Sequence, residues 1–142
     1  MLIQRSFFLF LFISLLVFSQ EKDLNLPNLG DRVSGVISLE QERILGQGFL
    51  EQVYAQAPLI DDPIIQEYTE LLIYKLSETS QVKDRQFTIV LIDEKSLNAF
   101  AAPGGVIGVN GGLFLNAGNE AQLASVLGHE LAHLSQRHFA RN

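Results

Sequence analysis

The stretch His129-Glu130-Leu131-Ala132-His133 constrains this chain more than any other. It has the pattern HExxH, whose three polar side chains lie close together only if the stretch is a helix. Residues four apart on an α-helix lie one turn apart on the same face. Both imidazoles can therefore reach one metal ion, while Glu130 lies close to a water on that ion but is not placed as a ligand. Zinc binds neutral imidazole nitrogens, and a catalytic zinc keeps one position open for water.

The chemistry that this arrangement supports is hydrolysis by a metal-bound water. Zinc lowers the pKa of that water towards about 7, and a nearby carboxylate can take its proton. We therefore predict that zinc is the cofactor, that His129 and His133 are its ligands, and that Glu130 is the general base of peptide-bond hydrolysis.

Two other readings of the motif are a solvated helix face with an ordinary ion pair and a closed structural metal site. An apolar stripe beside the histidines argues against the first reading, because unpaired polar groups at the edge of a core are costly. Closed zinc sites usually have four protein ligands, often cysteines, and this chain has no cysteine. The stripe consists of Leu123, Val126, Leu127, Leu131 and Leu134.

Capping signals predict two earlier helices. Ser38 and Gln41 fit a capping box that opens a helix over residues 38–56. Two glycines inside it, Gly46 and Gly48, indicate either a close backbone neighbour or an imperfect helix. Asp62 before Pro63 opens the second helix, which should end near residue 78. The expected inward residues of the first helix are Ile44, Leu45, Phe49 and Val53; the periodic apolar residues of the second are Ile64, Ile65, Tyr68, Leu71, Leu72 and Leu76.

Three strands and the HExxH helix complete the predicted elements. Residues 87–92 are typical of a buried strand, and residues 98–102 and 106–109 of two short strands joined by a proline-glycine turn. The glycines here are compatible with a phosphate loop, but no GK[ST] follows, so tight turns explain them better. The small-sided strand at Ala99, Phe100 and Ala101 is a candidate substrate-binding edge, where a peptide can pair backbone to backbone. The last helix should run from a cap at Asn119 to about Phe139.

The N-terminus predicts export. Residues 1–19 have a positive charge at Arg5, an apolar run and a plausible cleavage point, as in a signal peptide; an uncleaved anchor is the alternative. Residues 20–37 read as an irregular segment, and residues 38–142 as the N-terminal part of a catalytic domain. After removal of residues 1–19, nine basic residues face sixteen acidic ones, which argues against nucleic acid as a partner.

No third zinc ligand is apparent near the motif. His138 and Glu120 are each nine residues from His129, which places them on other faces of the helix. The third protein ligand is therefore expected from elsewhere.

Several of these stretches together resemble one known family. They are Asn98-Ala99-Phe100, Pro103-Gly104-Gly105, Gly112-Leu113, Glu120-Ala121-Gln122-Leu123-Ala124 and the HExxH motif. These look like the HtpX and CAAX-prenyl-protease superfamily of zinc metallopeptidases. The stretches Asn25-Leu26-Pro27, Ala57 to Pro63 and Gln136-Arg137-His138 are more narrowly similar to its periplasmic, BepA-like branch.

The resemblance implies an α+β fold: a mainly helical zincin-type domain with a small sheet beside the HExxH helix, here truncated. It implies a zinc endopeptidase of the periplasm that acts on misassembled outer-membrane proteins and contacts the outer-membrane assembly machinery. The family's third ligand is a glutamate on a later helix, so residues 1–142 alone are expected to be inactive. The alternative function is a non-catalytic, chaperone-like binding module that retains the fold.

Overall fold

The computed structural model describes residues 37–136, which form four α-helices and a three-stranded sheet. This confirms the predicted α+β class. The elements in order are α1 (Leu39–Gln56), α2 (Pro63–Glu78), β1 (Thr88–Ile92), β2 (Ala99–Ala102), the short 3-10 turn η2 (Pro103–Gly105), β3 (Val106–Asn110), α3 (Gly111–Asn116) and α4 (Glu120–Gln136).

The sheet has the order β1-β3-β2. β1 runs parallel to β3, whereas β2 runs antiparallel to it and joins it through η2, which confirms the predicted proline-glycine hairpin. β2 is thus an edge strand, with Phe100 opposite Gly108.

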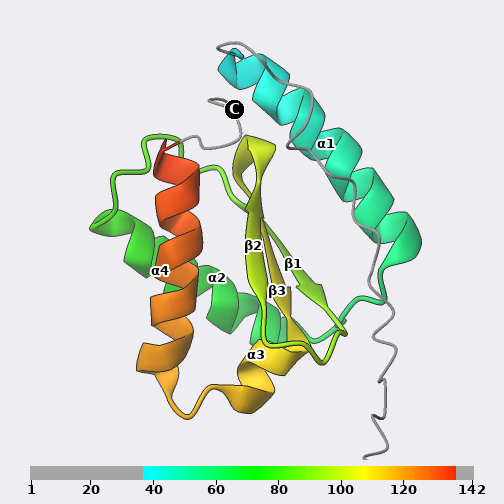
Figure 1. The fold of residues 1–142 in the computed structure, drawn as a ribbon, viewed down its shortest axis with the longest axis vertical. Coiled ribbons are helices and arrows are strands. Elements are labelled where there is room, and N and C mark those ends of the chain that lie inside the picture. The colour runs from blue at the N-terminus through cyan, green and yellow to red at the C-terminus, as the bar shows by residue number, and fades with distance from the viewer. Residues whose placement is uncertain (1–36, 137–142) are drawn as a thin grey trace, which may run out of the picture.

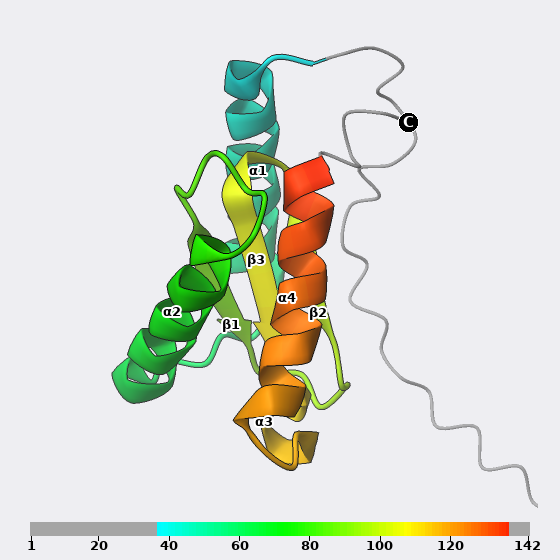
Figure 2. The same ribbon diagram turned by 90° about the vertical axis from the view of Figure 1, so that its left-hand side faces the viewer.

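Helices cover both faces of the sheet. α1 lies along one face, and α2 and α4 lie on the other (Figure 1, Figure 2). Each face has its own apolar cluster, one that includes α2 and α4 and a smaller one beneath α1. Since the strands are buried from both sides, β3 carries five buried residues in succession.

The predicted caps start the helices where expected. Ser38 and Gln41 form the complete capping box of α1, and the Asp62 carboxylate accepts the N–H groups of Ile64 and Ile65 at the start of α2. Before α4, Asn119 Oδ1 accepts the N–H of Gln122 at 3.0 Å. Each bond satisfies a backbone donor that the first helical turn leaves without an intrahelical partner.

The inward faces of α1 and α2 differ in part from the prediction. Ile44, expected to point inward, is 58% exposed, and on α2 Ile64 and Leu71 are exposed too. Some of the buried places are taken by small residues instead. On α2, Thr69 and Ser77 are fully buried because each hydroxyl donates to a carbonyl of its own helix at 2.7 Å, so neither burial leaves a polar group unpaired.

The predictions for the signal peptide, for nearly all of the irregular segment, for the end of the last helix and for His138 lie outside the described residues. Within residues 37–136, none of the helices has the length and the apolar character needed to cross a membrane.

Candidate metal centre

The HExxH motif lies on α4, at the margin of the larger apolar cluster. The leucines of this helix point into that cluster, and the side chain of Leu127 is completely buried. His129 is exposed, and Glu130 and His133 are half-buried. The apolar stripe therefore anchors the helix while the motif stays accessible, as the sequence predicted.

The two imidazoles converge on one point. The Nε2 atoms of His129 and His133 are 2.9 Å apart, and their rings lie edge to face with centroids at 4.5 Å. The carboxylate of Glu130 belongs to the same group, whose potential ligand atoms all lie within 4.8 Å of one another. Two imidazoles on a tetrahedral zinc, with bonds of about 2.0–2.1 Å, place their nitrogens roughly 3.3 Å apart. The donors present fit zinc after a small ring rotation.

A third ligand is absent from this group among residues 37–136, since no further His, Cys, Asp or Glu joins it there. Glu120 is engaged elsewhere, because its Oε2 accepts a hydrogen bond of 3.0 Å from the hydroxyl of Tyr68 on α2. This agrees with the prediction that Glu120 faces away from the histidines.

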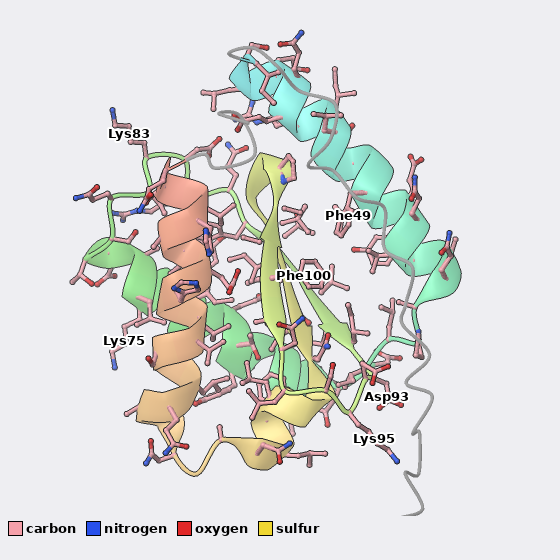
Figure 3. All side chains as sticks on the ribbon, viewed as in Figure 1. Phe49, Lys75, Lys83, Asp93, Lys95 and Phe100 are labelled. Carbon is pink, nitrogen blue, oxygen red and sulfur yellow. The ribbon has the colours of Figure 1, made fainter. Side chains whose placement is uncertain are left out.

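β2 packs against α4, but its three candidate substrate-binding residues do not share a face. Ala99 and Ala101 contact the cluster to which α4 contributes. The Phe100 side chain lies on the opposite face, where its ring packs edge-on against Phe49 of α1, with centroids 5.7 Å apart (Figure 3). The phenyl group of Phe100 is therefore separated from the motif by the sheet.

The backbone of β2 shows which groups the edge offers. Asn110 donates its N–H to the carbonyl of Asn98 at 3.0 Å, so these two residues form a hydrogen-bonded pair. In an antiparallel ladder such pairs alternate along the strand. Given the register, Phe100 is bonded toward β3, while Ala99 and Ala101 direct their N–H and C=O groups away from it.

The other sheet edge is covered. Ile60 donates its N–H to the carbonyl of Leu91 at 3.0 Å, and the amide of Gln66 donates to the carbonyl of Ile89 at 3.2 Å. No described strand covers β2 in the same way, so β2 is the open edge of the described sheet, with Ala99 buried and Ala101 half-buried along it. The sequence showed where this strand lies but not which of its amides point outward.

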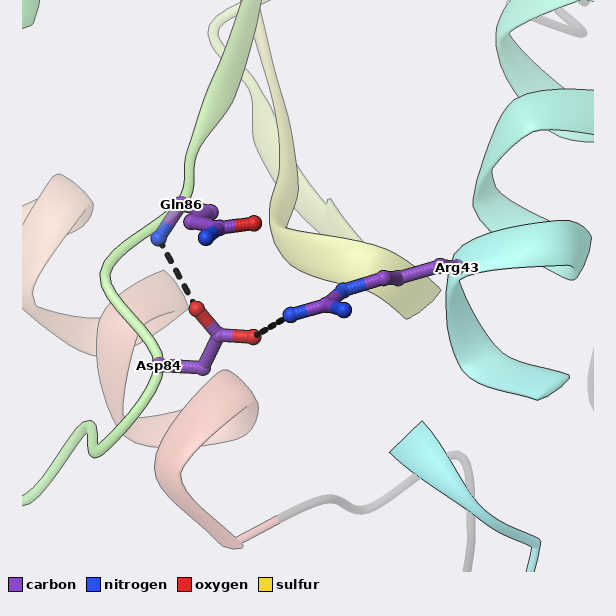
Figure 4. Close-up of polar contacts among 3 residues, drawn as sticks. All are labelled: Arg43, Asp84 and Gln86. Atoms are coloured by element: carbon purple, nitrogen blue, oxygen red, sulfur yellow. Dashed lines mark hydrogen bonds and ion pairs between the residues drawn. The ribbon is translucent and has the colours of Figure 1, made fainter. Parts of the chain in front are cut away.

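A cavity of about 290 Å³ lies near the C-terminal end of α4 and is lined in part by Leu134 and Arg43. Arg43 pairs with Asp84 across 2.9 Å, and Asp84 also accepts the N–H of Gln86 (Figure 4). No residue of the HExxH motif lines this cavity.

Comparisons with known proteins identify the family of the chain. The profile of Peptidase family M48 matches residues 63–142. The chain is 37% identical over 116 residues to the beta-barrel assembly-enhancing protease of Escherichia coli K12, covering 82% of this chain and 24% of that protein, with the same figures for the protein of that name from Yersinia pestis.

A more distant relative is the mitochondrial metalloendopeptidase OMA1 of Arabidopsis thaliana, which is 32% identical over 82 residues, 58% of this chain and 17% of that protein. The chain spans about a quarter of the length of its bacterial relatives. Because the M48 profile matches more than half of the sequence, including the HExxH helix, the chain belongs to peptidase family M48.

Proposed function

We propose that this chain carries the catalytic helix of a zinc-dependent endopeptidase. His129 and His133 hold the zinc, and Glu130 is the general base. The observation that carries the proposal is the convergence of two imidazole nitrogens, 2.9 Å apart, with a half-buried carboxylate in the same group.

Each part of the site has a distinct task in peptide hydrolysis. When bound, zinc lowers the pKa of a water and polarises the scissile carbonyl. Glu130 accepts the proton of the attacking water and passes it to the leaving amine nitrogen. Because Glu130 is on the same helix as the two histidines, its Cα keeps a fixed position relative to theirs and its carboxylate stays within reach of their group.

The substrate binds as an extended strand along β2. The outward N–H and C=O groups of Ala99 and Ala101 pair with its main chain, so recognition needs an accessible, unfolded segment and depends little on side chains. Phe100 contributes through the strand that it supports, not through its ring.

The cellular role that we propose follows from the bacterial relatives, which are named for enhancing beta-barrel assembly. We propose that the complete protein is exported to the periplasm, where it degrades misassembled outer-membrane proteins beside the assembly machinery. An edge that accepts unfolded main chain suits such substrates.

The test compares Glu130→Gln with Glu120→Gln in the complete protein. Both changes replace a carboxylate by an amide on the same helix, but only Glu130 lies in the histidine group. We expect Glu130→Gln to retain zinc and to lose casein cleavage by at least about 100-fold, because the amide cannot accept a proton. Glu120→Gln should cleave normally.

Chelation should abolish cleavage by the wild type, and added Zn²⁺ should restore it. Cleavage by Glu130→Gln within a few-fold of the wild type would remove Glu130 from the mechanism. A complete protein that binds zinc and protein chains but never cleaves them would instead support the non-catalytic binding module.

A further inference from the structure

We propose that Gly46 of α1 is a positioning residue. It lets α1 approach the turn that follows β2, and this turn holds the edge of β2 along which the peptide binds. This inference rests on the proposed function, because it concerns the strand along which the substrate is taken to bind.

The first observation is a direct approach of two backbones. Gly46 is buried, and a methyl group in its place would overlap the carbonyl oxygen of Pro103 and lie 3.1 Å from its carbonyl carbon. From the other side, a methyl group on Gly104 would lie 3.0 Å from the Cα of Arg43. The helix and the turn are thus as close as a backbone without side chains allows.

The second observation is that this turn continues directly from the edge. Pro103 follows Ala102, the last residue of β2. Three residues after Gly46 on the same helix, Phe49 packs edge-on against Phe100 of β2. α1 therefore contacts both the end and one face of β2, while α4 packs against its other face.

These contacts fix the edge relative to the histidines. β2 is held between α1 and α4, so a shift of the turn away from α1 moves the outward amides relative to His129 and Glu130. Hydrogen bonds weaken steeply with misalignment, so a displaced edge holds the peptide main chain less tightly and KM rises, while a peptide that does bind still reaches the histidine pair because α4 is not moved.

The chain provides a matched control. Gly48 lies two residues further along α1, and a methyl group there would meet nothing within 4 Å. Gly46→Ala and Gly48→Ala are therefore the same chemical change in the same helix, and only the first forces the helix and the turn apart.

The experiment measures zinc content and the kinetics of an internally quenched peptide that is long enough to span β2, using the complete zinc-loaded protein. We expect Gly46→Ala to raise KM by about tenfold, with kcat and zinc content close to the wild type, because the histidine helix is not moved. Gly48→Ala should match the wild type in all three. Equal KM values for the two variants would overturn the proposal, as would a loss of zinc in Gly46→Ala.

Two further variants make every outcome informative. If Gly46→Ala does not fold, Phe49→Leu weakens the same support without adding volume, and an unchanged KM in that variant would refute the proposal. Ala101→Pro removes an outward N–H from the edge itself. If Ala101→Pro leaves KM unchanged, the peptide does not bind along β2 and the substrate part of the proposed function fails; if only Gly46→Ala leaves it unchanged, the positioning role alone fails.

Discussion

One phenol joins the second helix to the start of the HExxH helix. The hydroxyl of Tyr68 donates to Glu120 at 3.0 Å. Burial raises the pKa of Tyr68, and the hydrogen bond and negative charge of Glu120 raise it further. The folded protein therefore keeps this phenol protonated to a higher pH than the unfolded chain does.

This shift predicts a loss of stability at alkaline pH. Because the folded pKa is the higher one, the stabilisation is complete below the unfolded value of about 10 and is lost as the pH rises through the folded pKa. The free energy of unfolding of the wild type should therefore fall more steeply with pH than that of Tyr68→Phe. At neutral pH, Tyr68→Phe should cost at most about 1 kcal/mol.

Urea unfolding from about pH 8 to about pH 11 measures this difference, since the range spans the ordinary tyrosine pKa. Tyr74→Phe is the control, because Tyr74 is on the same helix but packs its ring against Phe87. If the free energy of unfolding changes with pH in the same way for wild type and Tyr68→Phe, the contact with Glu120 makes no pH-dependent contribution to stability.

Single residues of the candidate site differ in how far they could be predicted. His129 and His133 follow from spacing alone, because a helix fixes the relation between residues four apart. Phe100 does not, because the direction of a strand side chain depends on the register with β3 and on which helix covers each face. Its contact with Phe49 joins segments that no local pattern connects.

At the scale of an element, the directions of the N–H groups of β2 decide which residue should be changed to test substrate binding. Proline at Phe100 would remove an N–H that is bonded toward β3 and so damage the sheet itself. Proline at Ala101 removes an N–H that points outward, a position that edge strands tolerate. Ala101→Pro is therefore the sharper variant.

We expect Ala101→Pro to fold, to bind zinc as the wild type does, and to raise KM for the spanning peptide by roughly 3- to 30-fold, about what one or two lost hydrogen bonds cost. Ala101→Gly, which keeps the N–H, should stay much closer to the wild type. Zinc analysis, thermal unfolding and steady-state kinetics decide the matter. Equal KM values for the two variants would place the peptide elsewhere.

The elements as a set were largely predictable, and their inward faces only in part: Phe49 and Val53 are buried as expected, whereas Ile44 is exposed. Caps at Ser38 and Asp62 are local chemistry, so they mark helix starts without knowledge of the fold. The side of α1 that meets the turn is chosen by Gly46 and Pro103, residues far apart in sequence. Periodicity favoured the larger Ile44, although the closest packing is made by a glycine.

For the whole molecule, the sheet and α2 cover the apolar stripe of the HExxH helix. Leu123 and Leu127 of α4 are buried within the described residues. Large exposed apolar side chains occur elsewhere, among them Ile44 on α1, Ile64 and Leu71 on α2, and Leu115 on α3. If residues 37–136 self-associate in isolation, the contact should therefore use these exposed side chains and not the apolar stripe of α4.

The described residues supply an incomplete set of zinc ligands, and this should lower the affinity for zinc. Within residues 37–136 the site offers two imidazoles, whereas catalytic zinc usually has three protein ligands. Loss of even an outer-shell partner costs roughly 10- to 100-fold in metal affinity. An isolated fragment of residues 20–142 should thus bind zinc more than about a hundredfold more weakly than the complete protein, and should not cleave peptides.

Isothermal titration of the fragment with zinc and a fluorogenic peptide assay test this expectation. The same fragment with His133→Ala gives the background, because it retains one imidazole of the pair. The fragment should bind zinc measurably better than this variant, since two convergent imidazoles still chelate one ion. Suppose instead that the fragment binds one zinc ion with the affinity of the complete protein and cleaves the peptide. A third ligand would then lie within residues 20–142 but outside residues 37–136.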